Sequence, residues 1–106
     1  MRCAFLILAL FSFSAHADFK DGNKLHSELS DTGPVPRSIA IGYITGIADA
    51  YGGTNHCPPG NVTAGQLNDM VKNYLDNTPS IRHLPASIIV SHVLKSVWPC
   101  KKGNGV

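Results

Sequence analysis

The sequence predicts an all-α protein, a small bundle of about four helices with one disulfide. Apolar residues recur at helical spacing in several stretches, and loops that contain glycine or proline separate these stretches. A chain of 106 residues has room for one small domain, and a charged fraction of 15% excludes a disordered charged tail. A net charge of +2 is too small to indicate nucleic acid or a membrane surface as the partner.

The first 17 residues have the layout of a secretory signal peptide. Arg2 supplies a positive start, an apolar run follows from Cys3 to Phe13, and small residues close the segment at Ala17. The apolar run is too short to span a bilayer. We therefore expect cleavage after Ala17, export, and a single mature domain of residues 18–106 with no membrane anchor. The alternative is an apolar N-terminal helix that packs in the core.

Cysteine usage supports an exported domain. Removal of the leader takes Cys3 with it and leaves Cys57 and Cys100. Two cysteines in an exported chain predict one disulfide. Because a domain this small buries only about 60–65% of its unfolded surface, such a cross-link contributes much of its stability.

The first predicted helix is short and lies within residues 18–30. Leu25 and Leu29 are one helical turn apart and define its apolar side. Residues 31–36 contain two prolines and a glycine, which predicts a loop.

The second predicted helix starts at Pro36, because a proline is tolerated at the first helical position. Its apolar residues fall on two faces, which places it at the centre of the bundle. Alternating apolar residues near its start also permit a strand, but Gly42 and Gly46 favour a helix that a neighbouring helix can approach closely. The pair Gly52 and Gly53 ends it.

The third predicted helix has the clearest local signal. An exposed loop over Thr54–Asn61 precedes it, and Thr63 with Gln66 three residues later forms a capping box. The segment Asn77–Pro79 stops the helix. Its apolar stripe consists of Leu67, Met70, Val71, Tyr74 and Leu75.

A last helix follows the segment Pro79–Leu84, which is a connector or a single turn. Pro85 opens the helix, and Trp98 and Pro99 end it. Ile88 is an additional apolar residue beside its stripe. The stripe itself consists of Ala86, Ile89, Val90, Val93, Leu94 and Val97.

Catalytic and metal-binding patterns are missing from the sequence. The two cysteines that follow the leader are better explained by a disulfide than by a catalytic nucleophile, and no serine lies in a nucleophile-elbow context. His56 and Cys57 are adjacent and cannot easily converge on one ion, and His83 and His92 lack a chelating spacing on a helix. We expect no catalytic residue, no metal and no cofactor, and we place the histidines at the surface or in an interface.

Two connectors are better candidates for function. Thr54–Asn61 and Asp76–His83 are polar and are rigidified by proline. Ordered loops on a rigid scaffold lose little entropy on binding and make good recognition surfaces.

The segment from Gly42 to Cys100 resembles a known family. The similar pieces are GYITGIADAY, CPP, VTAGQLNDMVKNYLDNTPSIRHLPASIIV and the terminal VWPC. Together they are similar to the type VI secretion amidase immunity proteins, the Rap/Tai family.

The resemblance implies a function of binding and not of catalysis. Members of the family are small exported helical proteins, often homodimers, and stay in the periplasm of the cell that fires the toxin. They bind a peptidoglycan amidase and block its cysteine–histidine active-site cleft. The family's disulfide corresponds to Cys57 and Cys100 of this chain.

We place the toxin contact in the second connector, at Asn77, Ser80, Ile81, Arg82 and His83. Arginine pairs with carboxylates, and histidine forms hydrogen bonds within a cleft. The alternative for Arg82 and His83 is that they brace the bundle. The alternative function is a periplasmic adaptor module of the same fold with a partner other than an amidase.

Overall fold

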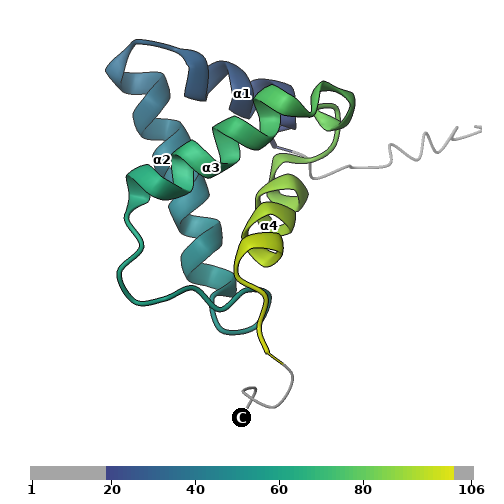
Figure 1. The fold of residues 1–106 in the computed structure, drawn as a ribbon. Helices are drawn as coiled ribbons and strands as arrows, with labels where there is room; N and C mark the ends of the chain where they lie inside the picture. The colour runs from purple at the N-terminus through teal and green to yellow at the C-terminus, as the bar shows by residue number, and fades with distance from the viewer. Residues whose placement is uncertain (1–18, 102–106) are drawn as a thin grey trace, which may run out of the picture.

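The fold is an all-α bundle, as the sequence predicts. The computed structural model describes residues 19–101, so the predicted signal peptide, residues 1–17, lies outside them. Within this described part, four α-helices and one short 3₁₀ helix occur and no β-strand. They are α1 (Gly22–Ser30), α2 (Pro34–Tyr51), α3 (Ala64–Asn77), η1 (Pro79–Ile81) and α4 (Ala86–Val97) (Figure 1). None of these helices is long and apolar enough to cross a membrane.

The start of α1 is tied to the segment that precedes α4. The backbone N–H of Gly22 donates to the carbonyl of Leu84 at 2.9 Å, and that of Asn23 donates to the carbonyl of Arg82 at 2.8 Å. A side chain at Gly22 has no room, because its Cβ would lie 2.5 Å from Ile89 Cδ1 and 2.8 Å from the Arg82 carbonyl. The glycine therefore permits the close approach of these two segments.

Helix α2 begins at Pro34, two residues before the predicted start at Pro36. The carboxylate of Asp31 accepts a hydrogen bond from Gly33 N–H at 2.7 Å and turns the chain into the helix. The first turn of a helix has no intrahelical partner for its N–H groups, so both prolines fit there. The loop between α1 and α2 is therefore shorter than the predicted loop of residues 31–36.

The two glycines in the middle of α2 face open space. A Cβ at Gly42 or Gly46 would meet no atom within 4 Å, although we expected a neighbouring helix to approach there. The buried side of the helix carries Ala40 and Ile44, each 0% exposed. Because successive residues turn by about 100°, the glycines lie on the opposite side, which no other described helix covers.

Helix α3 has the predicted capping box. The N–H of Gln66 donates to Thr63 Oγ1 at 3.2 Å, and Gln66 Oε1 accepts from Thr63 N–H at 2.8 Å. These two bonds satisfy backbone donors that a helix N-terminus leaves unpaired. Pro85 immediately precedes α4, and the N–H of Trp98 donates to the carbonyl of Leu94 at its end, as expected for this segment.

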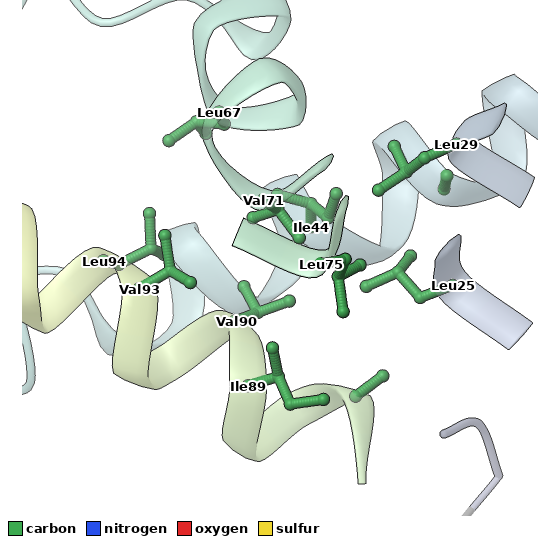
Figure 2. Close-up of a cluster of buried hydrophobic side chains, with 12 residues drawn as sticks. Leu25, Leu29, Ile44, Leu67, Val71, Leu75, Ile89, Val90, Val93 and Leu94 are labelled. Atoms are coloured by element: carbon green, nitrogen blue, oxygen red, sulfur yellow. The ribbon is translucent and has the colours of Figure 1, made fainter. Parts of the chain in front are cut away.

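One hydrophobic core holds the four helices together. In Figure 2, Leu25 of α1 and Leu75 of α3 point toward one another, and Val90 lies beside them on α4. Burial of a leucine or valine side chain stabilises a fold by about 1.5–3 kcal/mol. The core consists of Leu25, Leu29, Ala40, Ile44, Leu67, Val71, Leu75, Ala86, Ile89, Val90, Val93 and Leu94.

The predicted disulfide is present. Cys57 and Cys100 are bonded, with their Cα atoms 4.9 Å apart. The bridge ties the loop between α2 and α3 to the chain after α4, and the N–H of Cys57 donates to the carbonyl of Trp98 at 2.8 Å. Both ends of the bundle are therefore fixed by contacts between distant parts of the chain.

His56, expected at the surface, is buried with 1% of its area exposed. The loop folds inward at this point because Gly53 N–H donates to the His56 carbonyl at 2.7 Å and Asn55 Nδ2 donates to the Ser91 carbonyl at 3.0 Å. Neither ring nitrogen of His56 has a hydrogen-bond partner among the described residues. The loop is thus exposed over most of its length and anchored at Asn55, His56 and Cys57.

Candidate interaction surface

The connector between α3 and α4 is a compact series of turns. Helix α3 ends at Asn77, and η1 follows after Thr78, whose carbonyl accepts from Ile81 N–H at 3.3 Å. The carbonyl of Ile81 in turn accepts from Leu84 N–H at 3.0 Å. These local bonds and the pairing with the start of α1 give the connector a defined shape, as a recognition segment requires.

The five residues that we predicted for a toxin contact lie together on this connector but differ in environment. Asn77, Ser80 and His83 are exposed. Ile81 is half-buried and packs against the core. Arg82 is half-buried as well. The structure thus presents three polar side chains outward and holds the other two against the bundle.

Arg82 braces the end of α3. Its Nε donates to the carbonyl of Leu75 at 2.8 Å, and its Nη2 lies 3.4 Å from the carbonyl of Asp76. These carbonyls are among those that a helix C-terminus leaves without an intrahelical partner, and a cation there is favourable. This geometry matches the bracing role that we considered as the alternative for Arg82.

An ion cluster joins the same end of α3 to α1. Lys72 Nζ lies 2.8 Å from Asp76 Oδ2, and His26 Nε2 lies 2.6 Å from Asp76 Oδ1. The hydrogen bond from Lys72, followed by that from His26, holds the pKa of the Asp76 carboxyl below its usual range. Asp76 is therefore ionised at neutral pH and links α3 to α1 through its contact with His26.

A second ion pair is buried beside α1. Lys20 Nζ lies 2.5 Å from Glu28 Oε1 with both side chains nearly covered, and it lies 4.6 Å from the centre of the Tyr43 ring. A buried charge needs such a partner to offset the loss of hydration. This cluster ties Lys20, which precedes α1, to Glu28 of α1 and Tyr43 of α2. No group of histidine, cysteine, aspartate and glutamate side chains that could hold a metal ion occurs among residues 19–101.

Two apolar cavities lie between α3 and α4, next to the connector. The first has a volume of about 290 Å³ and is lined by Met70, Asn73, Tyr74, Asn77, Val93, Ser96 and Val97. The second, of about 250 Å³, is lined by Tyr74, Ile81, Leu84, Ile88, Ile89 and His92. We call the pair, with these lining residues, the α3–α4 groove.

Tyr74 is common to both cavities, and its ring centre lies 5.6 Å from that of His92 at an interplanar angle of 50°. The sequence places Tyr74 in the helical stripe of α3, so its second role in a groove was not predicted. Ile88 was the available signal, because it is an apolar residue outside the stripe of α4. Ile88 is 58% exposed and forms part of the groove's rim.

The chain was compared with known proteins. No curated protein matches it significantly. The family model of the Rap1a immunity proteins matches residues 21–100, a range that includes all four helices and both bridged cysteines. The match confirms the resemblance noted in the sequence, and this chain therefore belongs to the Rap1a immunity protein family.

Proposed function

We propose that this protein is a periplasmic immunity protein that binds a peptidoglycan amidase delivered by type VI secretion and occludes its active site. The observation that carries the proposal is the family match over residues 21–100. Immunity proteins act by binding a cognate toxin, so the protein works as a stoichiometric inhibitor and not as a catalyst. The sequence resemblance to amidase immunity proteins supports the choice of toxin.

The connector between α3 and α4 is the segment that we place at the toxin's catalytic cleft. Asn77, Ser80 and His83 are exposed on it and are able to form hydrogen bonds with a polar cleft. Ile81 and Arg82 hold the connector in shape from below, through the core and through the carbonyls at the end of α3. A segment that is ordered before binding loses little entropy when it enters a cleft.

Export to the periplasm is supported by two features of the chain. Residues 1–17 have the layout of a signal peptide, with predicted cleavage after Ala17. The bridge between Cys57 and Cys100 is of a kind that persists in oxidising compartments such as the bacterial periplasm. A periplasmic inhibitor is also placed where a cell-wall amidase acts.

A homodimer is part of the proposal, because the resemblance implies one, and the free side of α2 is where we place the second copy. Val35 and Ile39 are 67% and 51% exposed on that side. Gly42 and Gly46 follow them at helical spacing, with open space above each. The missing side chains would let a second α2 approach closely.

Titration of toxin activity tests the proposed function. The probe is a peptidoglycan amidase encoded next to this gene, where one is found, assayed on purified peptidoglycan with increasing amounts of the chain of residues 18–106. We expect activity to fall in proportion to the added chain and to vanish at one chain per toxin, while serum albumin has no effect. Full activity in a large excess of the chain contradicts the proposal. Stable association without inhibition selects the adaptor module instead.

A further inference from the structure

The α3–α4 groove is uncharged. Among its described lining residues there is no aspartate, glutamate, lysine or arginine, and His92 is the only histidine. On α3, Lys72 and Asp76 are engaged with one another and with His26 of α1. Asp69 of α3 and Lys95 of α4 adjoin lining residues in the sequence but line neither cavity. A charged partner surface placed on this groove would lose its hydration without gaining an opposite charge.

Helix α4 carries more apolar surface than the core uses. Ile89 and Val93 form the floor of the groove and are 2% and 4% exposed. Ile88 and Val97 belong to the same helix and line the same groove, yet they are 58% and 49% exposed. An exposed apolar patch with a polar surround is typical of a protein interaction site.

The two cavities are of a size that accommodates apolar side chains. An apolar cavity of about 150 Å³ holds a benzene ring, so each cavity here, at 290 and 250 Å³, has room for one large apolar side chain or two smaller ones. The α4 residues that line the two cavities are centred roughly 9 Å apart along the helix axis, at 1.5 Å per residue.

We infer that the α3–α4 groove is the main anchor site for the toxin and takes two apolar side chains from one uncharged segment of it. This inference rests on the proposed function. The connector borders the groove at both cavities, through Asn77 in the first and Ile81 and Leu84 in the second. A toxin whose cleft receives the connector must therefore cover the groove, and the neutral apolar lining matches a neutral apolar segment.

The groove also has the properties of an affinity-determining centre. Tyr74 is half-buried between the two cavities and packs against His92, so its position is fixed before the partner arrives. Tyrosine in an ordered pocket is a common centre of binding energy in protein interfaces. The polar connector then orients the protein in the toxin's cleft, and the groove contributes most of the affinity for the toxin.

Charge-introducing variants at the groove's rim test this inference. Ile88→Asp and Val97→Asp change exposed positions, so both variants should fold with a melting temperature close to that of the unaltered chain. We expect each to weaken binding to the neighbouring-gene amidase by about 30-fold or more, the loss typical of an anchor residue. Tyr51→Asp is the matched control, because Tyr51 is 52% exposed and lines neither cavity, and it should bind normally.

Isothermal titration calorimetry gives the affinities, and light scattering of the free chain gives its oligomeric state. Unchanged affinity of both rim variants, with binding by the unaltered chain, overturns the inference and leaves the proposed function standing. A change from dimer to monomer in the rim variants also overturns it, since the groove would then hold a second copy. No binding by the unaltered chain overturns the proposed function and, with it, this inference.

Discussion

Replacement of both bridged cysteines by serine should lower the free energy of unfolding by about 4 kcal/mol and leave the helices in place. Cys57 and Cys100 are 43 positions apart, and the chain-entropy relation for a loop of that length gives this figure. The bridge acts mainly on the unfolded chain, which becomes freer without it. For a domain of this size, 1 kcal/mol corresponds to about 4–8 °C, so the melting temperature should fall by about 15–30 °C.

The structure explains why the helices should survive this change. Neither cysteine belongs to the hydrophobic core, which consists of side chains from α1, α2, α3 and α4. The loop that carries His56 loses one of its ties, but the bond from Asn55 to the Ser91 carbonyl remains. Far-UV circular dichroism at low temperature should therefore be nearly unchanged, and the loss should appear in the thermal transition.

The assay is thermal unfolding of the mature chain with and without reductant. Reductant should lower the melting temperature of the unaltered chain and have no effect on the Cys57→Ser, Cys100→Ser variant, which serves as the control. An unaltered chain that melts at the same temperature in both conditions refutes the reasoning. If the variant has no helical signal at low temperature, the claim that the hydrophobic core keeps the helices folded without the disulfide is refuted.

Three further substitutions test particular contacts. Gly22→Ala should destabilise the fold by about 1–3 kcal/mol in urea unfolding, because the new Cβ would meet the Arg82 carbonyl at 2.8 Å; equal stability would mean that the two segments separate easily. Arg82→Ala should cost about 1–3 kcal/mol, because it removes a charged donor from the carbonyls at the end of α3, and an unaffected unfolding midpoint would leave the residue free for toxin binding. Asp76→Asn should be less stable than the unaltered chain at neutral pH, where the carboxylate with its lowered pKa is ionised and paired. That difference should shrink as the pH falls through this pKa, below the ordinary value of 3.8, and a constant difference across pH would contradict the ion pairs.

The helices could be predicted from the sequence because their signals are local. The capping box of Thr63 and Gln66 and the apolar stripe after it are sufficient to define α3, and Pro85 and Trp98 mark the limits of α4. The disulfide was predictable because only two cysteines follow the predicted leader. Such signals depend on neighbours within a few positions, and tertiary contacts do not override them here.

The start of α2 and its packing were predicted less well. Pro34 and Pro36 both fit a first helical turn. The helix begins at Pro34 because the carboxylate of Asp31 accepts a hydrogen bond from Gly33 N–H and turns the chain there. The spacing of Gly42 and Gly46 indicates that a close approach is possible but not that a helix of the same chain makes it. Which side of a doubly apolar helix faces the core depends on its neighbours.

The candidate interaction surface could be predicted least well, because it is formed by contacts between segments that are distant in the sequence. The inward turn of the loop at His56 depends on the bond from Asn55 to the carbonyl of Ser91, which lies 36 positions further along the chain, so the local sequence does not indicate it. The bond from Arg82 to the Leu75 carbonyl likewise becomes visible only when the connector folds back on α3. The groove arises from two helices, so a pattern within either helix could not reveal it.

Occlusion of the toxin's active site is tested most directly by the reactivity of the toxin's catalytic cysteine. In a protein made from residues 18–106, Cys57 and Cys100 are the two cysteines and are bonded to each other, so a small alkylating reagent finds free thiols only in the toxin. We predict that labelling of the catalytic cysteine is fast in free toxin and is suppressed when one mature chain is added per toxin. Labelling at the same rate in a stable complex would contradict the account, because the chain would then bind without covering the cleft.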